Sequence, residues 1–376
     1  MPAPPEPNAD GRLFPLDATR GLIIAFMALD HASYFIARAH SPGEHWGGPF
    51  PTYTAALPFL TRLVTHLCAP GFFFLMGAGI SLFTESRRHQ GWKDRRIILY
   101  LWARGALLVA LQFLVINPIW KAGLEPFPVT YIGVLVALGG TLILASLLIR
   151  MNSTALGLLA LVMLVGTELL HPSPDQWGTL EDEPWNLVLL RSGGDGTLWS
   201  NYPLLPWLEL VLFGMSFGRW LLADRRGTYV RGLWLGITLV FAFAAIRYLD
   251  GFGNIRPRTG DTWIDFFNVV KYPPSLAFTS LTMGVNLILL YGFSRGYERF
   301  ASISQPLLVL GREPLFLYVT HLGLYMLLGR MLSSSGTSLP GMFPYWLAGL
   351  MLLYPLALVY GRFKKDKPPG SVWRFL

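Results

Sequence analysis

Apolar stretches long enough to cross a bilayer recur along the whole chain, separated by short segments that hold most of the charged residues. A helix needs about 20 such residues to cross roughly 30 Å of hydrocarbon. Lipid offers backbone polar groups no partner, so each stretch is expected to be helical. The pattern predicts an all-α polytopic bundle of about ten spans, at residues 20–39, 57–83, 97–116, 129–149, 154–170, 204–222, 231–248, 274–294, 314–333 and 342–361.

Proline and glycine refine this prediction near the C-terminus. The ninth span could begin near residue 304, with a break between Gly311 and Pro314, because proline interrupts a continuing helix. No repeat and no long linker is visible, so residues 1–376 are expected to form one domain. Residues 1–15 are Pro-rich and lack a secretory signal, which predicts a disordered N-terminal arm before a first span that is retained.

Composition supports the membrane assignment. Of 376 residues, 53% are hydrophobic and only 14% are charged, whereas about a quarter of the residues in soluble proteins are charged. Lysine and arginine gather in alternate loops and in the basic tail, residues 363–376, which predicts that these segments and both termini are cytoplasmic. The net charge of +8 then reflects topology rather than nucleic-acid binding.

Three histidines, His31, His66 and His321, lie inside apolar stretches. Ionisable groups at that depth are costly and mark functional sites in membrane proteins. Imidazole can act as nucleophile or general base near neutral pH, although a hydrogen-bonded strut between helices is the structural alternative. The spacing does not fit a helical metal motif, and Cys68 is the only cysteine, so no metal is expected.

Helix geometry relates these histidines to nearby charges. A short loop joins the first two spans, so the spans should be antiparallel neighbours, with His31 and His66 each about 13 Å below the outer boundary. Arg62 and His66 share one face of the second span. Asp30 lies about 100° around the helix from His31, so its predicted partner is across the bundle.

Weaker candidates lie at the two membrane boundaries. Asp17 and Arg20 are one turn apart and predict a local pair near the cytoplasmic edge. Three histidines of the outer loops could contact a polar acceptor molecule, although solvated side chains are the simpler interpretation: His40, His45 and His171.

Five ordered blocks carry a family resemblance: LDATRGLIIAFMALDHASYF, FLTRLVTHLCAPGFFFLMGAGISL, NYPLLPWLELVLFGMSFG, KYPPSLAFTSLTMG and LGREPLFLYVTHL. Together they resemble bacterial membrane proteins related to the catalytic domain of heparan-α-glucosaminide N-acetyltransferase. The resemblance implies transfer of an acetyl group from cytoplasmic acetyl-CoA to a sugar amine or hydroxyl across the membrane, with or without an acetyl-histidine intermediate. The eukaryotic member has asparagine near the position of Asp30 or His31, and its histidine falls in the loop corresponding to residues 40–56.

Acyl transfer assigns roles to these residues. His31 or His66 would act as base or nucleophile, together with Asp30 and His321. Arginines are the expected hydrogen-bond donors to the developing oxyanion and the expected cations for the CoA phosphates. The predicted co-substrate site comprises Arg20, Arg62, Arg104 and Arg312, with Arg95 and Arg96 as further cations.

The leading hypothesis is therefore an acyl-CoA-dependent acyltransferase of a bacterial inner membrane, acting on a sugar or glycan acceptor at the outer side. Acetyl is the expected acyl group, and a homodimer is possible. A transporter that relays protons through the histidines is the alternative, and it should show two halves of inverted topology, which the sequence does not show. A non-catalytic scaffold would leave the histidines on separate faces.

Overall fold

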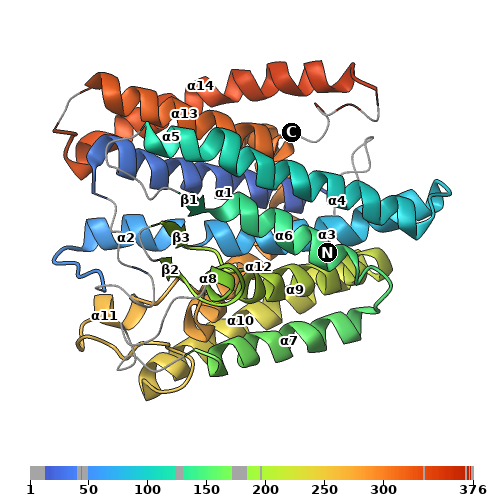
Figure 1. The fold of residues 1–376 in the computed structure, drawn as a ribbon, viewed down its shortest axis with the longest axis horizontal. Coiled ribbons are helices and arrows are strands. Elements are labelled where there is room, and N and C mark those ends of the chain that lie inside the picture. Colours follow the sequence, from blue (N-terminus) through green and yellow to red (C-terminus); the bar gives the residue numbers. More distant parts are fainter. Residues whose placement is uncertain are drawn as a thin grey trace.

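The computed structural model describes residues 13–39, 44, 50–122, 130–171, 184–194, 197–332, 335–368, 371 and 373, with the backbone alone at 297–303. Helices dominate this part of the chain and run side by side along the long axis of the molecule (Figure 1). The helices are α1 (Phe14–Ala32), η1 (Ser33–Ala37), α2 (Ala56–Thr65), α3 (Cys68–His89), α4 (Asp94–Leu111), η2 (Gln112–Ile116), α5 (Asn117–Lys121), α6 (Val134–Ser146), α7 (Ser153–Leu169), α8 (Pro184–Leu189), α9 (Leu204–Ala223), α10 (Arg225–Leu249), α11 (Trp263–Phe267), α12 (Leu276–Arg312), α13 (Pro314–Leu332) and α14 (Leu339–Lys365).

Seven helical segments among the described residues are long and apolar enough to cross a membrane, and they make the chain an integral membrane protein. They are Phe14–Ala37, Ala56–His89, Asp94–Lys121, Arg225–Leu249, Leu276–Gly296, Pro314–Leu332 and Leu339–Lys365. The other three predicted spans coincide with α6, α7 and α9, of which α6 has only 13 residues. A helix of that length is about 20 Å long and cannot cross the hydrocarbon alone. The count of ten spans and the side of the termini remain predictions.

A small sheet departs from the all-α prediction. Strand β1 (Thr130–Ile132) pairs in parallel with β3 (Leu198–Ser200), which pairs antiparallel with β2 (Gly193–Gly194). The fourth predicted span therefore begins in a strand, and its helix starts only after Gly133. These segments lie in connections between helices, where their backbone groups can pair with one another instead of continuing a helix.

The second predicted span consists of two helices rather than one. Helix α2 ends at Thr65 and α3 begins at Cys68, so His66 and Leu67 occupy a turn between them. Proline at position 70 explains the interruption, because it cannot donate the helical hydrogen bond to the carbonyl of His66 and its ring crowds that carbonyl. His66 therefore lies at a point where the helix is broken.

Near the C-terminus the predicted break is present. Helix α12 continues for 37 residues through the segment expected to be a loop, ends at Arg312, and is followed by Glu313 and then by Pro314, the first residue of α13. Helix α1 packs very closely on α12: a Cβ atom on Gly311 would lie 1.9 Å from the carbonyl oxygen of Asp17. Glycine at this position permits the backbone contact that brings the break beside the start of α1.

Basic residues from the end of α3, the connection between α6 and α7, and the end of α9 meet at one end of the bundle. Arg88 and Arg150 both bind Asp94, with Nε to Oδ distances of 3.0 and 2.7 Å. Arg219, at the far end of α9, donates to the carbonyl of Ile149 at 2.6 Å. The α3–α4 turn and the end of α14 lie toward this end, at the right of the view, and α2 and α11 lie toward the other (Figure 1). The two ends are called the basic end and the opposite end below.

Candidate functional site

His31 and His321 form a direct pair between α1 and α13. The Nδ1 atom of His31 lies 2.6 Å from the Nε2 atom of His321. His321 is fully buried, and its Nδ1 atom lies 2.8 Å from the carbonyl oxygen of Leu317. Trp120 packs edge-on against the His31 ring, with 5.6 Å between ring centroids. The pair is therefore held by the α13 backbone through Leu317 and by Trp120 of α5.

The hydrogen bonds of this pair define its protonation. A carbonyl only accepts, so the Nδ1 atom of His321 carries a proton and donates it to Leu317. In neutral His321 the Nε2 atom then accepts a hydrogen bond from the N–H group at Nδ1 of His31. Neutral His31 consequently has a lone pair and no proton at Nε2. This is the tautomer that an imidazole needs to act as nucleophile or base.

A second network surrounds Arg62, on α2, which is 6% exposed. Its guanidinium forms ion pairs with Asp30 of α1 and with Glu44 of the connection between α1 and α2. Thr65 completes the network by donating to Asp30 at 3.0 Å. Asp30 thus finds its partner across the bundle, as the helical-wheel argument predicts. Because Asp30 adjoins His31 in the chain, the two clusters are neighbours.

His66 is bound to Oε1 of Glu44, which also accepts from Nε of Arg62 at 2.7 Å. Its Nε2 atom lies 3.0 Å from Oε1 of Glu44, and both side chains are almost fully buried. A carboxylate at this position accepts, so Nε2 carries the proton and Nδ1 has the lone pair. Nδ1 of His66 is buried and has no hydrogen-bond partner in the described part of the chain. The structure therefore places His66 beside Arg62 and pairs His31 with His321, rather than joining all three rings directly.

Glu44 was not predicted from the sequence. It belongs to a Pro- and Gly-rich connection, where no periodicity indicates which side chain turns inward. Burial alone would raise the pKa of the Glu44 carboxyl, but the charges and hydrogen bonds of Arg62 and His66 hold that pKa well below its usual range. Glu44 is therefore a carboxylate, and it gives this site a second negative charge that Arg62 bridges to the first.

Lys271 and Tyr272 were also missed as site residues. The amide of Tyr272 donates to the carbonyl oxygen of Glu44 at 3.1 Å, so the segment before α12 holds the Glu44 backbone in place. Lys271 is 3% exposed and interacts electrostatically with His66. Its only sequence signal is a cation directly before an apolar stretch. The hydroxyl of Tyr272 lies 3.0 Å from that of Tyr202, which ties this segment to the start of α9.

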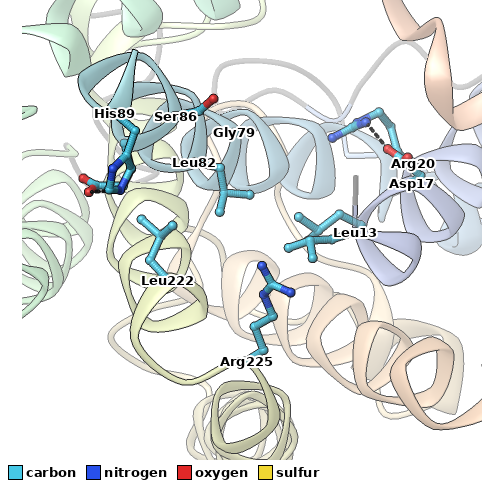
Figure 2. A pocket seen from close by; sticks show the side chains of 11 residues that line it. Leu13, Asp17, Arg20, Gly79, Leu82, Ser86, His89, Leu222 and Arg225 are labelled. Carbon is cyan, nitrogen blue, oxygen red and sulfur yellow. Dashed lines mark hydrogen bonds and ion pairs between the residues drawn. The ribbon is translucent and has the colours of Figure 1, made fainter. Parts of the chain in front are cut away.

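A cavity of about 360 Å³ lies at the basic end, between α1, α3, α9 and α10 (Figure 2). Arg20 approaches it from α1 and Arg225 from the start of α10, and Leu13 and Leu82 add apolar surface. Arg20 donates from Nη1 to Asp17 at 2.9 Å and to the carbonyl of Gly311 at 3.1 Å. The predicted Asp17–Arg20 pair is thus present, next to the break between α12 and α13, whereas Arg225 was not predicted.

The predicted co-substrate arginines fall in different places. Arg20 lines the basic-end cavity, and Arg312 ends α12 beside the carbonyl that Arg20 binds. Arg62 lies instead at the histidine site, where it binds Asp30. His31, the next residue, is eleven residues after Arg20 in helix α1, which corresponds to about 16 Å along the helix axis. Arg104 is half buried on α4, and no described hydrogen bond or ion pair joins it to either place.

A much smaller cavity, of about 10 Å³, lies beside Asp30, Arg62 and Thr65. This volume is about that of one water molecule. Of the outer-loop histidines, His40 and His45 lie outside the described residues. His171 follows α7 and bonds through Nδ1 to the carbonyl of Thr167, and burial lowers its pKa to about 4. No set of three or more potential metal ligands is grouped among the described residues.

One comparison with known proteins decides the family. The model of the heparan-alpha-glucosaminide N-acetyltransferase catalytic domain matches residues 12–243. The chain belongs to this family. The match confirms the resemblance seen in the sequence motifs and indicates a membrane acyltransferase. It spans the chain from before α1 into α10, so it includes His31, Glu44 and His66, whereas His321 lies beyond it. A comparison with curated proteins gave no match.

Proposed function

We propose that the protein moves an acetyl group from acetyl-CoA, bound at the basic end, to a sugar or glycan acceptor at the opposite end. In this proposal the basic end is cytoplasmic and the membrane is the inner membrane of a bacterium. The observation that carries the proposal is the His31–His321 pair, because its hydrogen bonds give the half-buried His31 an unprotonated Nε2 atom. Family membership supports acyl transfer as the reaction.

His31 is the proposed nucleophile. Its Nε2 lone pair attacks the thioester carbonyl carbon, the carbon–sulfur bond breaks, and CoA leaves as the thiolate. As the new N–C bond forms, the proton on Nδ1 of His31 becomes acidic and passes to Nε2 of His321 along the 2.6 Å hydrogen bond. The positive charge that appears on His321 is offset by the carboxylate of Asp30, which interacts electrostatically with that ring.

Acceptor attack completes the cycle. The acceptor oxygen or nitrogen loses a proton as it adds to the acyl carbon, the bond from that carbon to Nε2 of His31 breaks, and the proton on His321 returns to Nδ1 of His31. The acceptor proton passes to solvent and balances the charge of the departing CoA thiolate. Each protein group ends in its starting state. The same sequence of steps applies to water, which would yield slow hydrolysis of acetyl-CoA without any other acceptor.

The basic-end cavity is the proposed entry site of the donor. Its volume of about 360 Å³ and its arginines, Arg20 and Arg225, suit phosphate groups, and its leucines suit an apolar arm. The cavity adjoins the interruption at Glu313, and broken helices at membrane depth are tolerated where they line a cavity. From Arg20 the acyl arm must extend about 16 Å along α1 to meet His31.

Radiolabelled acetyl-CoA tests this proposal with the purified chain in lipid nanodiscs. Rapid denaturation should trap label on the protein, and hydroxylamine should remove it, since acyl-imidazoles are labile to that nucleophile. His31→Ala should carry no such label. Tyr325→Phe, on the same helix as His321 but bonded to the carbonyl of Trp346, serves as the folded control. Retention of the label by His31→Ala would refute the assignment of the nucleophile.

A further inference from the structure

The Nδ1 atom of His66 is a buried polar atom with no partner in the described part of the chain. Leaving such an atom unpaired lowers stability, because its interaction with water is lost and not replaced, so a specific reason for it is expected. The atom belongs to the turn between α2 and α3, where the helix is already interrupted. Both features are unfavourable for a side chain whose role is only to pack.

Glu44 determines which His66 nitrogen is unprotonated. Its Oε1 atom accepts from Nε2 of His66 at 3.0 Å, which leaves the lone pair on Nδ1. Both oxygens of Glu44 also accept from Arg62, Oε1 from Nε at 2.7 Å and Oε2 from Nη2, so the carboxylate cannot turn away from the ring without losing an ion pair. A carboxylate in this position also stabilises the imidazolium that forms when Nδ1 takes a proton.

The same residues connect His66 to the proposed nucleophile. Arg62 binds Glu44 on one side and Asp30 on the other, and Asp30 precedes His31 in α1. His31 is bonded to a neutral histidine, whereas His66 is bonded to a carboxylate. The two rings are therefore suited to different steps. His31 has an unprotonated nitrogen that can attack carbon, and His66 has a nitrogen that can accept a proton and hold it.

We propose that His66 is the general base for the acceptor and that Glu44 is its positioning residue. The inference rests on the proposed function and adds the second half of its reaction. Nδ1 of His66 removes a proton from the acceptor as the acceptor oxygen or nitrogen bonds to the acyl carbon and the bond to His31 breaks. The proton is released from His66 once the product has left. The site is thereby suited to acceptors that must lose a proton to react: sugar hydroxyls, ammonium groups and water.

The test compares water with hydroxylamine as acceptor in the presence of acetyl-CoA, with the full chain in nanodiscs. Water must be deprotonated, whereas hydroxylamine attacks acyl groups at neutral pH without a base. In Glu44→Gln, hydrolysis should fall about 100-fold, a typical contribution of general base catalysis. Turnover with hydroxylamine, corrected for the reaction without protein, should stay within about threefold of the parent chain. Glu44→Asp should recover part of the hydrolysis.

His66→Asn provides a second variant in case Glu44→Gln fails to fold, and it should show the same selective loss. Glu168→Gln is the matched control. The Glu168 side chain also holds a connection in place, the one between α10 and α12, by accepting from the amides of Ile255 and Leu276, and it does not contact His66. A loss that arises from packing lowers both reactions equally, and this result in Glu44→Gln and His66→Asn would overturn the inference. His31→Ala should lose both reactions; if it does not, the proposed nucleophile is wrong while the comparison of acceptors still reports on Glu44.

Discussion

The Nδ1 atom of His31 lies 2.6 Å from Nε2 of His321, although 290 residues separate the two histidines in the chain. His321 is in turn fixed by the carbonyl of Leu317, one turn earlier in α13. In the proposed mechanism, this order of hydrogen bonds makes His321 the group that orients His31 and receives its proton. The arrangement has the form of a nucleophile or base held by a third group.

Replacing His321 should therefore slow the donor half of the reaction. In His321→Asn, proton acceptance from Nδ1 of His31 is lost, so release of CoA from acetyl-CoA should fall about 100-fold, whichever acceptor follows. A thiol reagent that reports free CoA measures this rate. The outcome that contradicts the assignment is an unchanged rate of CoA release together with a folded protein.

Arg62 should matter chiefly for stability. It neutralises both Asp30 and Glu44, and removing one partner of a buried ion pair costs about 3–5 kcal/mol. Arg62→Leu should lower the midpoint of thermal unfolding by about 5–15 °C. Cys68 is the only cysteine and is buried, so its reaction with a thiol-reactive dye reports unfolding.

Arg62→Lys serves as the comparison for this prediction. It keeps the charge but has no planar guanidinium to bind two carboxylates at once, so an intermediate midpoint is expected. Equal midpoints for Arg62→Leu and the parent chain would show that the network is not a stabilising element.

Glu44 should make stability depend on pH in the acid range. Burial alone raises the pKa of the Glu44 carboxyl, but the charges and hydrogen bonds of Arg62 and His66 lower that pKa by more. The folded-state pKa of Glu44 therefore lies well below its usual value. A depressed pKa contributes stability that is fully present above the unfolded-state value, near 4.3, and is lost as the pH falls through the folded-state value. The parent chain should therefore lose more stability than Glu44→Gln between about pH 5 and pH 3.

Tryptophan fluorescence can follow that loss, because the chain has 13 tryptophans and the measurement does not depend on thiol chemistry. The difference between the two chains isolates Glu44 from other carboxyls that titrate in the same range. Parallel curves for parent and variant would mean that Glu44 is not stabilised by its partners.

The affinity for acetyl-CoA should depend on the arginines of the basic-end cavity. Arg225→Gln should raise the KM for acetyl-CoA about tenfold and leave kcat within about threefold, since it removes one cation from the proposed phosphate site, which His31 does not line. Arg150→Gln is the control, because Arg150 belongs to the same end but binds Asp94 outside the cavity. If both variants change KM equally, the effect reflects general surface charge rather than this cavity.

Much of the bundle could be predicted from the sequence because it depends on local patterns. Apolar runs locate the helices, and proline at position 314 locates the break after Arg312. The equivalent interruption after Thr65 was missed, although Pro70 indicates it, because the apolar pattern continues through the turn. Helix α6 lies within the predicted span 129–149, but its short length and the strand before it were missed, because an apolar run alone does not distinguish a helix from a strand.

The candidate site was only partly predictable, since it is formed by helix packing. Helical spacing places Asp30 about 100° around α1 from His31 and predicts a separate partner across the bundle, which is Arg62. No local pattern indicates that α13 brings His321 to His31. Glu44 gives no signal of its own, because its inward position depends on Arg62 and on the amide of Tyr272, which follows more than 200 residues later.

Close packing of α1 on α12 lets Arg20, which lines the basic-end cavity, bind the carbonyl of Gly311, and a final prediction follows from this contact. A Cβ atom on Gly311 would lie 1.9 Å from the carbonyl oxygen of Asp17 and 2.9 Å from the amide of Gly21, so the helices must separate in Gly311→Ala. Overpacking of this kind costs about 1–3 kcal/mol. Separation should also weaken the bond from Arg20 to the Gly311 carbonyl, so unfolding should occur at lower temperature and the KM for acetyl-CoA should rise. Gly292→Ala, on the same helix with no atom within 4 Å of the added carbon, should unfold at or slightly above the parent temperature. If the two alanine variants have the same midpoint, glycine at position 311 is not required for the contact.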